Sequence, residues 1–241
     1  MSVPPKVAPQ ANSAPTTATA ADSQPGDTLA ERYAAMAHAY EGRRIDVVLR
    51  AMDLAIACTT LLLTSPLLLL IALATLITSG RPVLYRGQRV GRAARVFTMY
   101  KFRTLAADAE TRLGPYLGAE LTRRTEAELT GVGRALRPTH LDEIPQLLNV
   151  VRGDMSIVGP RPVRPPFFEE LCERIPGYWQ RLVVRPGVTG FAQTRFTRED
   201  SWEDKFVHDM EYIADRSVRL YLRVLGATVV RIITRMVRRA S

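Results

Sequence analysis

The feature that most constrains this chain is an uncharged apolar run from Leu54 to Thr78, LAIACTTLLLTSPLLLLIALATLIT. A helix needs roughly 20 apolar residues to cross the hydrocarbon core of a bilayer, and this run is long enough. The alternative is a helix buried in a protein core. A chain of 241 residues that folds around one core seldom hides so long an uncharged helix, so the run predicts contact with a membrane.

Two features of the run argue against a simple crossing. Pro66, preceded by Ser65, lies near its middle. Proline removes a backbone donor and clashes with the preceding turn, so we expect a kink there, and the Ser65 hydroxyl can bond a freed carbonyl. Basic residues mark cytoplasmic loops, and they flank the run on both sides, which favours a re-entrant helix over a kinked span with a short outer tail. The flanking residues are Arg43, Arg44, Arg50, Arg81, Arg86, Arg89, Arg92 and Arg95.

The run divides the chain into three parts. Residues 1–42 begin with a stretch rich in Ala, Pro, Ser and Thr, which predicts a disordered leader followed by a short helix from Thr28 to Arg44. Residues 43–80 are the expected membrane helix, and residues 81–241 are one further domain. Lys and Arg outnumber Asp and Glu by 33 to 24, for a net charge of +9, which indicates anionic partners such as phosphate-bearing substrates, anionic membrane lipids or nucleic acid.

Beyond the run, the patterning predicts a mainly α-helical domain with one small β-hairpin, an α+β fold. Short β-prone pieces within Pro82–Thr104 flank a connection rich in Gly and Arg, which is typical of a hairpin. Helical and loop segments follow. The expected helices cover residues 108–136, 142–151, 165–174 and 202–213, and the expected loops cover residues 153–166 and 185–190.

The last segment, residues 216–239, is predicted to be a basic amphipathic helix. At 100° per residue, its arginines gather on one side and its aliphatic residues on the other. Such a helix lies in the membrane interface with its arginines at lipid phosphates, and docking on the domain core is the alternative. The arginines are Arg216, Arg219, Arg223, Arg231 and Arg238, and the aliphatic residues are Val218, Leu222, Leu225, Val229, Ile232 and Met236.

The densest group of charged residues surrounds Asp142 and Glu143. In one interpretation Asp142 caps a helix and Glu143 complements the helix dipole. In the other, the helix N-terminus attracts a phosphate, a carboxylate attacks phosphorus as a nucleophile, and its neighbour holds Mg²⁺. His140 is adjacent to the pair, and we interpret it as a surface side chain rather than a general base. Arg137, Arg152 and Arg161 are close enough in sequence to surround a phosphate.

Four motifs occur in order along the chain. They are the apolar run with Ser65-Pro66, YKFRT at Tyr100–Thr104, LDEIPQLLNVVRGDMSIVGPRP at Leu141–Pro162, and RPGVTGFAQ at Arg185–Gln193. With them the chain, from about Arg44 to Arg238, resembles the monotopic polyprenyl-phosphate phosphoglycosyl transferases, also called the bacterial sugar transferase family. Two departures accompany the resemblance. Thr194-Arg195-Phe196 replaces a usual Gly-Arg element, and the short polar leader in place of further membrane helices makes this chain look like the minimal form.

The resemblance implies an enzyme that transfers a sugar-1-phosphate from a UDP-sugar to polyprenyl (undecaprenyl) phosphate, releases UMP and initiates a surface glycan or exopolysaccharide. It implies that Asp142 is the nucleophile of a phosphosugar-aspartyl intermediate and that Glu143 binds Mg²⁺. Lys101 and Arg103, in the YKFR element, are expected at the diphosphate or the membrane face, and Arg137 and Arg161 at the phosphate site. Ser65 and Pro66 match the bend of the family's re-entrant helix.

These inferences place the protein in the bacterial cytoplasmic membrane, with its catalytic domain on the cytosolic face. The two cysteines show neither disulfide nor metal-site spacing, which fits a reducing compartment. Nucleic acid is not an expected partner, because the chain has no helix-turn-helix, zinc or RNA-binding signature. The alternative function is a catalytically inactive, membrane-anchored scaffold of the same fold. The oligomeric state does not follow from the sequence.

Overall fold

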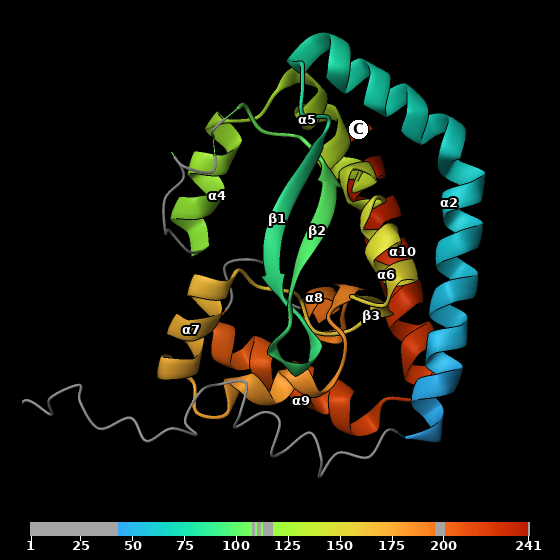
Figure 1. Ribbon diagram of the computed structural model, residues 1–241, viewed down its shortest axis with the longest axis vertical. Helices are drawn as coiled ribbons and strands as arrows, with labels where there is room; N and C mark the ends of the chain where they lie inside the picture. Colours follow the sequence, from blue (N-terminus) through green and yellow to red (C-terminus); the bar gives the residue numbers. More distant parts are fainter. Residues whose placement is uncertain (1–42, 108, 110–111, 113–117, 196–200, 241) are drawn as a thin grey trace, which may run out of the picture.

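The computed structural model describes residues 43–107, 109, 112, 118–195 and 201–240. The leader and short helix predicted within residues 1–42 lie outside this range. The described part is mainly helical with a β-hairpin, as predicted (Figure 1). A second, smaller sheet was not predicted.

The apolar run forms part of one long helix, α2 (Arg44–Ser79, 36 residues). Figure 1 shows that α2 bends partway along its length. Pro66 lies inside the helix and has no N–H to donate to the carbonyl of Leu62. The Ser65 hydroxyl donates to that same carbonyl at 2.8 Å, which confirms the predicted pairing. We call residues 44–65 the first limb of α2 and residues 66–79 the second limb.

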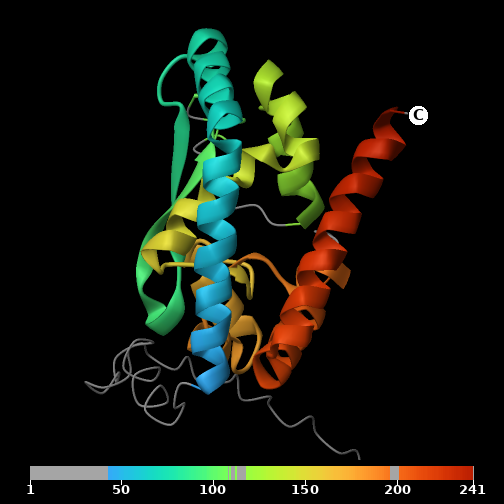
Figure 2. The ribbon, with the colours of Figure 1, turned by 90° about the vertical axis from the view of Figure 1, so that its right-hand side faces the viewer.

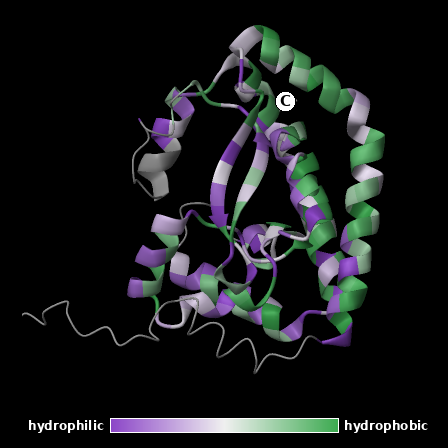
Figure 3. Cartoon of the chain, viewed as in Figure 1, coloured by the Kyte–Doolittle hydropathy of each residue, from purple (hydrophilic) through white to green (hydrophobic). Residues whose placement is uncertain are grey.

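Both limbs of α2 pack on the same domain. In the first limb Leu49, Asp53 and Ala57 are buried, and in the second limb Ile71 and Thr75 are buried. Between and around these positions the helix exposes a series of large apolar side chains, and Figure 3 shows the mainly apolar colouring of the second limb. The exposed residues from Leu62 onward are Leu62, Leu63, Leu67, Leu69, Leu70, Leu73, Leu76 and Ile77.

The predicted hairpin is confirmed. Strands β1 (Leu84–Val90) and β2 (Val96–Phe102) pair in antiparallel register. In β2 the side chains of Phe97 and Met99 are buried on one face, and Phe102, at the end of the strand, is buried on the other. By the same alternation Lys101 shares the face of Phe97 and Met99, and its ammonium meets Glu143.

A second sheet joins two segments that the sequence analysis assigned to loops. Strands β3 (Ser156–Val158) and β4 (Gly187–Thr189) are parallel and have three residues each. Strands of three residues show almost no alternation of apolar and polar side chains, and glycines and prolines surround them, so the sequence pattern indicated loops. The glycines let the two segments approach closely: a Cβ atom on Gly187 would lie 2.1 Å from the backbone nitrogen of Gly159.

The remaining elements are short helices and one long terminal helix. The predicted helix at Pro165–Arg174 has these same bounds, and the one at 202–213 extends to Asp215. These elements are α4 (Gly118–Ala127), α5 (Gly131–Leu136), η2 (Arg137–Thr139), η3 (Leu141–Glu143), α6 (Gln146–Arg152), α7 (Pro165–Arg174), η4 (Tyr178–Val183), α8 (Phe191–Arg195), α9 (Trp202–Asp215) and α10 (Val218–Ala240), and η1 (Arg92–Ala94) connects β1 to β2.

Part of the terminal helix α10 docks on the domain core, which was one of the two alternatives considered, and its location in the membrane interface stays a prediction. Tyr221 and Val224 are buried in the main core, so its first part docks on the domain. The helix exposes aliphatic side chains on another side, and Figure 2 shows the later part of α10 diverging from α2. The exposed residues are Leu222, Val229, Val230, Ile233, Met236 and Val237.

A buried carboxylate connects α2 to the rest of the core. Asp53 is 3% exposed. Its Oδ1 accepts hydrogen bonds from the backbone N–H of Ile157 at 2.8 Å, the hydroxyl of Tyr221 at 2.9 Å and the hydroxyl of Ser156 at 3.0 Å. One oxygen therefore joins α2, β3 and α10. A buried polar atom needs such partners to offset its lost hydration.

We predict that Asp53→Leu destabilises the protein more than Asp53→Asn. Leucine leaves the donors of Ser156, Ile157 and Tyr221 without an acceptor, at a cost of about 1–3 kcal/mol for each buried donor, whereas asparagine keeps an acceptor oxygen. Thermal unfolding of the detergent-solubilised protein measures the difference. An Asp53→Leu variant as stable as Asp53→Asn would show that the network contributes little.

Candidate active site

The residues around Asp142 form a chain of tight turns rather than the start of a helix. Helix α5 runs into η2, and His140 then adopts a left-handed conformation with φ 57°. The next turn is η3, which contains Asp142 and Glu143. Helix α6 begins only at Gln146, and its N-cap is Pro145. The interpretation of Asp142 as the cap of this helix is therefore wrong, because the left-handed residue diverts the chain before the helix starts.

The Asp142 carboxylate is buried, and its oxygens accept no hydrogen bond within the described residues. The residue is 6% exposed, and no residue in the described ranges donates a hydrogen bond to its side chain. Burial and the negative charge of Glu143 raise the pKa of Asp142, while Lys101, Arg137 and His140 partly oppose that rise. A buried carboxylate without a donor, surrounded by cations, is suited to attack an electrophile that those cations attract.

Glu143 is engaged by two neighbours. The ammonium of Lys101 lies 2.6 Å from Oε1, and Nδ1 of His140 lies 3.8 Å from Oε2. Burial favours a higher pKa for Glu143, but Lys101, His140 and Arg161 outweigh that effect and hold the pKa well below its ordinary value. The two neighbouring carboxyl groups thus have pKa values displaced in opposite directions, which separates their roles.

Two predicted arginines complete the cationic surroundings. Arg137 donates from Nε to the Thr104 hydroxyl at 3.3 Å and interacts electrostatically with both carboxylates. Arg161 has an exposed side chain whose charge acts on Glu143 and Lys101. The structure therefore brings together five of the predicted site residues: Lys101, Arg137, Asp142, Glu143 and Arg161.

The sixth predicted residue, Arg103, lies elsewhere. Strand β2 ends at Phe102, so Arg103 leaves the alternation that places Lys101 at Glu143. Its guanidinium donates to the carbonyls of Ser79, Gly80 and Arg81, at the end of α2. In this structure Arg103 anchors the chain where it leaves α2, and its expected role at the diphosphate or the membrane face stays a prediction.

The turn also contacts the apolar helix. Leu141, directly before Asp142, packs against a cluster formed by Ile71 of the second limb, Phe102 of β2 and Leu136 of α5. The second limb of α2 thus helps to hold the turn that carries both carboxylates. Asp142 therefore directly follows a residue that packs on α2.

His140 is the residue whose importance the sequence analysis underestimated. It supplies the left-handed conformation that forms the turn, and its ring faces Glu143. Histidine is one of the few side chains enriched among residues with positive φ, but nothing in the sequence alone marked this backbone conformation.

The departure from the family pattern at Thr194–Phe196 lies apart from this cluster. Arg195 stacks over the ring of Phe191, 4.1 Å from its centroid, and lies 3.9 Å from Glu211. Phe196 falls outside the described residues. The structure does not bring Arg195 to the carboxylates.

Comparison with known proteins identifies the family. A family model described as bacterial sugar transferase matches residues 45–235. The chain belongs to the bacterial sugar transferase family. The matched residues include nearly all of α2, the Asp142 turn and most of α10, so the apolar helix and the charged cluster both lie within the matched region.

Several curated proteins are similar to this chain, which spans less than half the length of some of them. The exopolysaccharide production protein PSS of Rhizobium leguminosarum bv. phaseoli is 36% identical, covering 79% of this chain and 98% of PSS. The UDP-N-acetylgalactosamine-undecaprenyl-phosphate N-acetylgalactosaminephosphotransferase of Aeromonas hydrophila is 35% identical, covering 77% of this chain and 43% of that protein. The UDP-glucose:undecaprenyl-phosphate glucose-1-phosphate transferase of Escherichia coli (strain K12) is 37% identical, covering 75% of this chain and 39% of that protein.

We predict that Lys101→Met moves the acidic limb of the enzyme's pH–rate profile to higher pH. Without the ammonium, burial is opposed by fewer cations, so the pKa values of Glu143 and Asp142 both rise and each carboxylate is lost at a higher pH as the solution is acidified. Lys101→Arg, which keeps the charge, is the matched control and should retain the wild-type limb. An unchanged acidic limb in Lys101→Met would contradict this electrostatic role.

Proposed function

We propose that this protein transfers a sugar-1-phosphate from a UDP-sugar to polyprenyl (undecaprenyl) phosphate and releases UMP. The observation that carries the proposal is the turn at Leu141–Glu143, which packs on the apolar helix α2. Its Asp142 carboxylate accepts no hydrogen bond within the described residues and lies near the charges of Lys101 and Arg137. The names of the relatives support the substrate classes, because several include an undecaprenyl-phosphate acceptor and some a UDP-sugar donor.

The proposed reaction has two displacements at one phosphorus atom. An Asp142 carboxylate oxygen attacks the β-phosphorus of the UDP-sugar, the bond between that phosphorus and the bridging oxygen breaks, and UMP leaves with the electron pair. The phosphosugar is then an acyl phosphate on Asp142. A phosphate oxygen of the polyprenyl phosphate attacks the same phosphorus, which yields the polyprenyl-diphosphate-sugar and restores the carboxylate.

The cations of the cluster bind and orient the diphosphate during both steps. The charge of Arg161 acts on Glu143 and Lys101, and the charge of Arg137 acts on Asp142, so an anion between them meets positive charge on both sides. Such fixed donors hold the phosphorus in line with the carboxylate and stabilise the charge that develops on the leaving oxygen.

The carboxylates also suit a bound Mg²⁺. Within the described ranges no group of three or more acidic, histidine or cysteine side chains could form a metal cage. Magnesium in phosphoryl-transfer sites commonly uses only one or two carboxylates together with substrate phosphates and water, and Glu143 and Asp142 fit that requirement. Glu143 would hold the ion, with Lys101 retained at its other oxygen. A bound ion would supply positive charge that lowers the repulsion between the Asp142 carboxylate and the diphosphate.

We further propose that α2 is a re-entrant membrane helix and that α10 lies in the membrane interface. Both limbs of α2 pack on the same domain, and a helix that crossed the bilayer would place its second limb on the opposite side. The exposed apolar side chains of α10 would enter the lipid, with its exposed Arg219 and Arg223 at anionic headgroups.

This arrangement gives the acceptor access to the nucleophile. The catalytic domain lies on the cytosolic face of the bacterial cytoplasmic membrane, where UDP-sugars are available. The polyprenyl chain stays in the hydrocarbon region while its phosphate reaches Asp142 beside the second limb of α2. The product is a lipid-linked first sugar, which suits the initiation of an exopolysaccharide or another surface glycan, the process named for the relative PSS.

We predict that Asp142→Asn abolishes Mg²⁺-dependent UMP release from a panel of UDP-sugars with undecaprenyl phosphate. Loss of a nucleophile that forms a covalent intermediate should lower the rate by at least about 10³-fold. Asp154→Asn, in the same segment but bonded to Asn149, is the matched control. A fully active Asp142→Asn variant would rule out the proposed nucleophile, and a wild-type protein without UMP release would favour the inactive scaffold.

We predict that both flanks of α2 are inaccessible from outside intact cells. Single cysteines at the exposed positions Arg44 and Arg81, in a variant without Cys58 and Cys172, should react with a membrane-impermeant maleimide only after permeabilisation. A cysteine in an exported periplasmic protein serves as the positive control. Labelling of one flank in intact cells would show a transmembrane span instead of a re-entrant helix.

A further inference from the structure

A buried ion pair lies beside the loop that carries Arg161. Arg181 in η4 is 4% exposed and Asp209 in α9 is also 4% exposed. The Arg181 Nη2 atom donates to Oδ2 of Asp209 at 2.7 Å, and Nη1 donates to the hydroxyl of Tyr178. The guanidinium also lies over the Tyr178 ring, with Cζ 4.8 Å from its centroid. Aromatic contacts to Phe168 and Phe206 enclose Tyr178, so this pair is firmly held.

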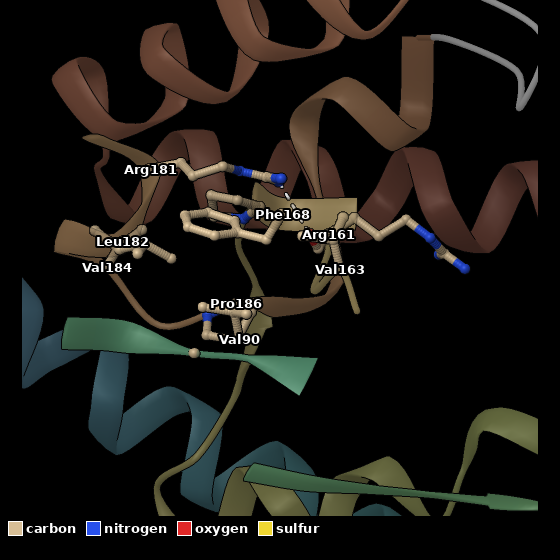
Figure 4. A pocket seen from close by; sticks show the side chains of 10 residues that line it. Val90, Arg161, Val163, Phe168, Arg181, Leu182, Val184 and Pro186 are labelled. Atoms are coloured by element: carbon tan, nitrogen blue, oxygen red, sulfur yellow. Dashed lines mark hydrogen bonds between the residues drawn. The ribbon is translucent and has the colours of Figure 1, made fainter. Parts of the chain in front are cut away.

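The same guanidinium reaches the backbone of Arg161. Its Nη2 atom donates to the Arg161 carbonyl at 2.9 Å, drawn as the dashed line in Figure 4. Figure 4 also shows the Arg161 side chain extending away from the other labelled side chains. These residues line a cavity of only about 10 Å³, which holds at most about one water and is no substrate pocket. The contact therefore fixes the peptide of Arg161 and leaves its guanidinium outside.

Arg161 lies in a segment in which several backbone carbonyls accept hydrogen bonds from neighbouring elements. The Pro160 carbonyl accepts from the N–H of Gly187 at 2.9 Å, and the Val163 carbonyl accepts from the N–H of Val90 at 3.0 Å. Pro162 further restricts the conformation of the residue before it. Of these anchors, only the bond from Arg181 is made by a side chain, so it is the one that a substitution can remove without altering the backbone.

The ion pair is poorly suited to a purely stabilising role. Burying two charges costs several kcal/mol of lost hydration for each ion, and apolar replacements are often as stable. In addition, Nε of Arg181 is buried and has no hydrogen-bond partner within the described part of the chain, which adds a further penalty. What the pair does provide is a rigid donor at one defined backbone carbonyl.

We propose that Arg181, held by Asp209 and Tyr178, is a positioning residue for Arg161, and that it directs the Arg161 guanidinium toward the diphosphate beside Glu143. The inference rests on the proposed transfer reaction. Arg181 touches neither substrate, and it acts only through the peptide of Arg161. Its removal lets that peptide shift, and small displacements of a positioning group are costly in a transfer between bound reactants.

A double-mutant cycle between positions 161 and 181 tests the proposal. Arg181→Lys keeps a buried positive charge for Asp209 but lacks the guanidinium that bonds Asp209 and the Arg161 carbonyl together. We expect it to lower kcat/KM for the UDP-sugar by roughly 10- to 100-fold in the wild-type background. In an Arg161→Met background it should cost less than about twofold, because the group it positions is gone. UMP release by the full chain in nanodiscs measures each value.

Thermal unfolding of the same samples separates positioning from stability. Arg216→Met is the matched control, because Arg216 is another buried arginine, 2.6 Å from Asp46 and distant from Arg161 in sequence and contacts. It should lower the unfolding temperature, and any loss of activity should be equal in the wild-type and Arg161→Met backgrounds. Arg181→Met is the second variant at the test position. Like Arg181→Lys, it should lower kcat/KM when Arg161 is present and have little effect in the Arg161→Met background.

The outcomes distinguish this proposal from the proposed function. An active wild type in which Arg181→Lys costs the same factor with and without Arg161 would overturn the positioning role alone. A wild type that releases no UMP would overturn the proposed reaction and the positioning role with it. Loss of activity confined to the Arg161-containing background supports both.

Discussion

The packing of the Asp142 turn against the second limb of α2 is the contact on which the rest of the structure depends. Leu141 shares a cluster with Ile71 and Phe102, so the turn sits between the apolar helix and the hairpin. The first limb is held to the core through Asp53, and the second limb ends at carbonyls bonded by Arg103. These anchors fix the site relative to the helix that we assign to the membrane.

The charged cluster uses burial to give two adjacent carboxylates different properties. Glu143 is paired with Lys101 at 2.6 Å, which keeps its carboxylate ionised. An ionised carboxylate can bind a metal cation or hold a fixed ion pair. Asp142 has no such partner in the described part of the chain, and burial raises its pKa. A more basic carboxylate is a better nucleophile once it is ionised, and the surrounding cations favour its ionised form.

Some of this architecture follows from sequence. The hydrogen bond from the Ser65 hydroxyl to the Leu62 carbonyl, the hairpin and helix α7 depend on local rules, so they were predicted correctly. The start of α6 was predicted too early, because the left-handed His140 and the η3 turn precede the helix. The hydrogen bonds of Arg103 to the carbonyls of Ser79, Gly80 and Arg81 were not predicted, because they depend on how the chain turns after β2 ends at Phe102. The parallel β3–β4 pair and the Arg181–Asp209 ion pair join segments far apart in the chain, and no local pattern reports such contacts.

The central claim is that Asp142 forms a covalent bond to the transferred phosphosugar. The most direct measurement is intact-protein and peptide mass spectrometry after incubation with Mg²⁺ and a UDP-sugar, without polyprenyl phosphate. The account predicts a mass increase equal to one sugar phosphate on the peptide that contains Asp142, labile to hydroxylamine and lost when the acceptor is added. A protein that releases UMP only when both substrates are present, and that never acquires this mass, would contradict it.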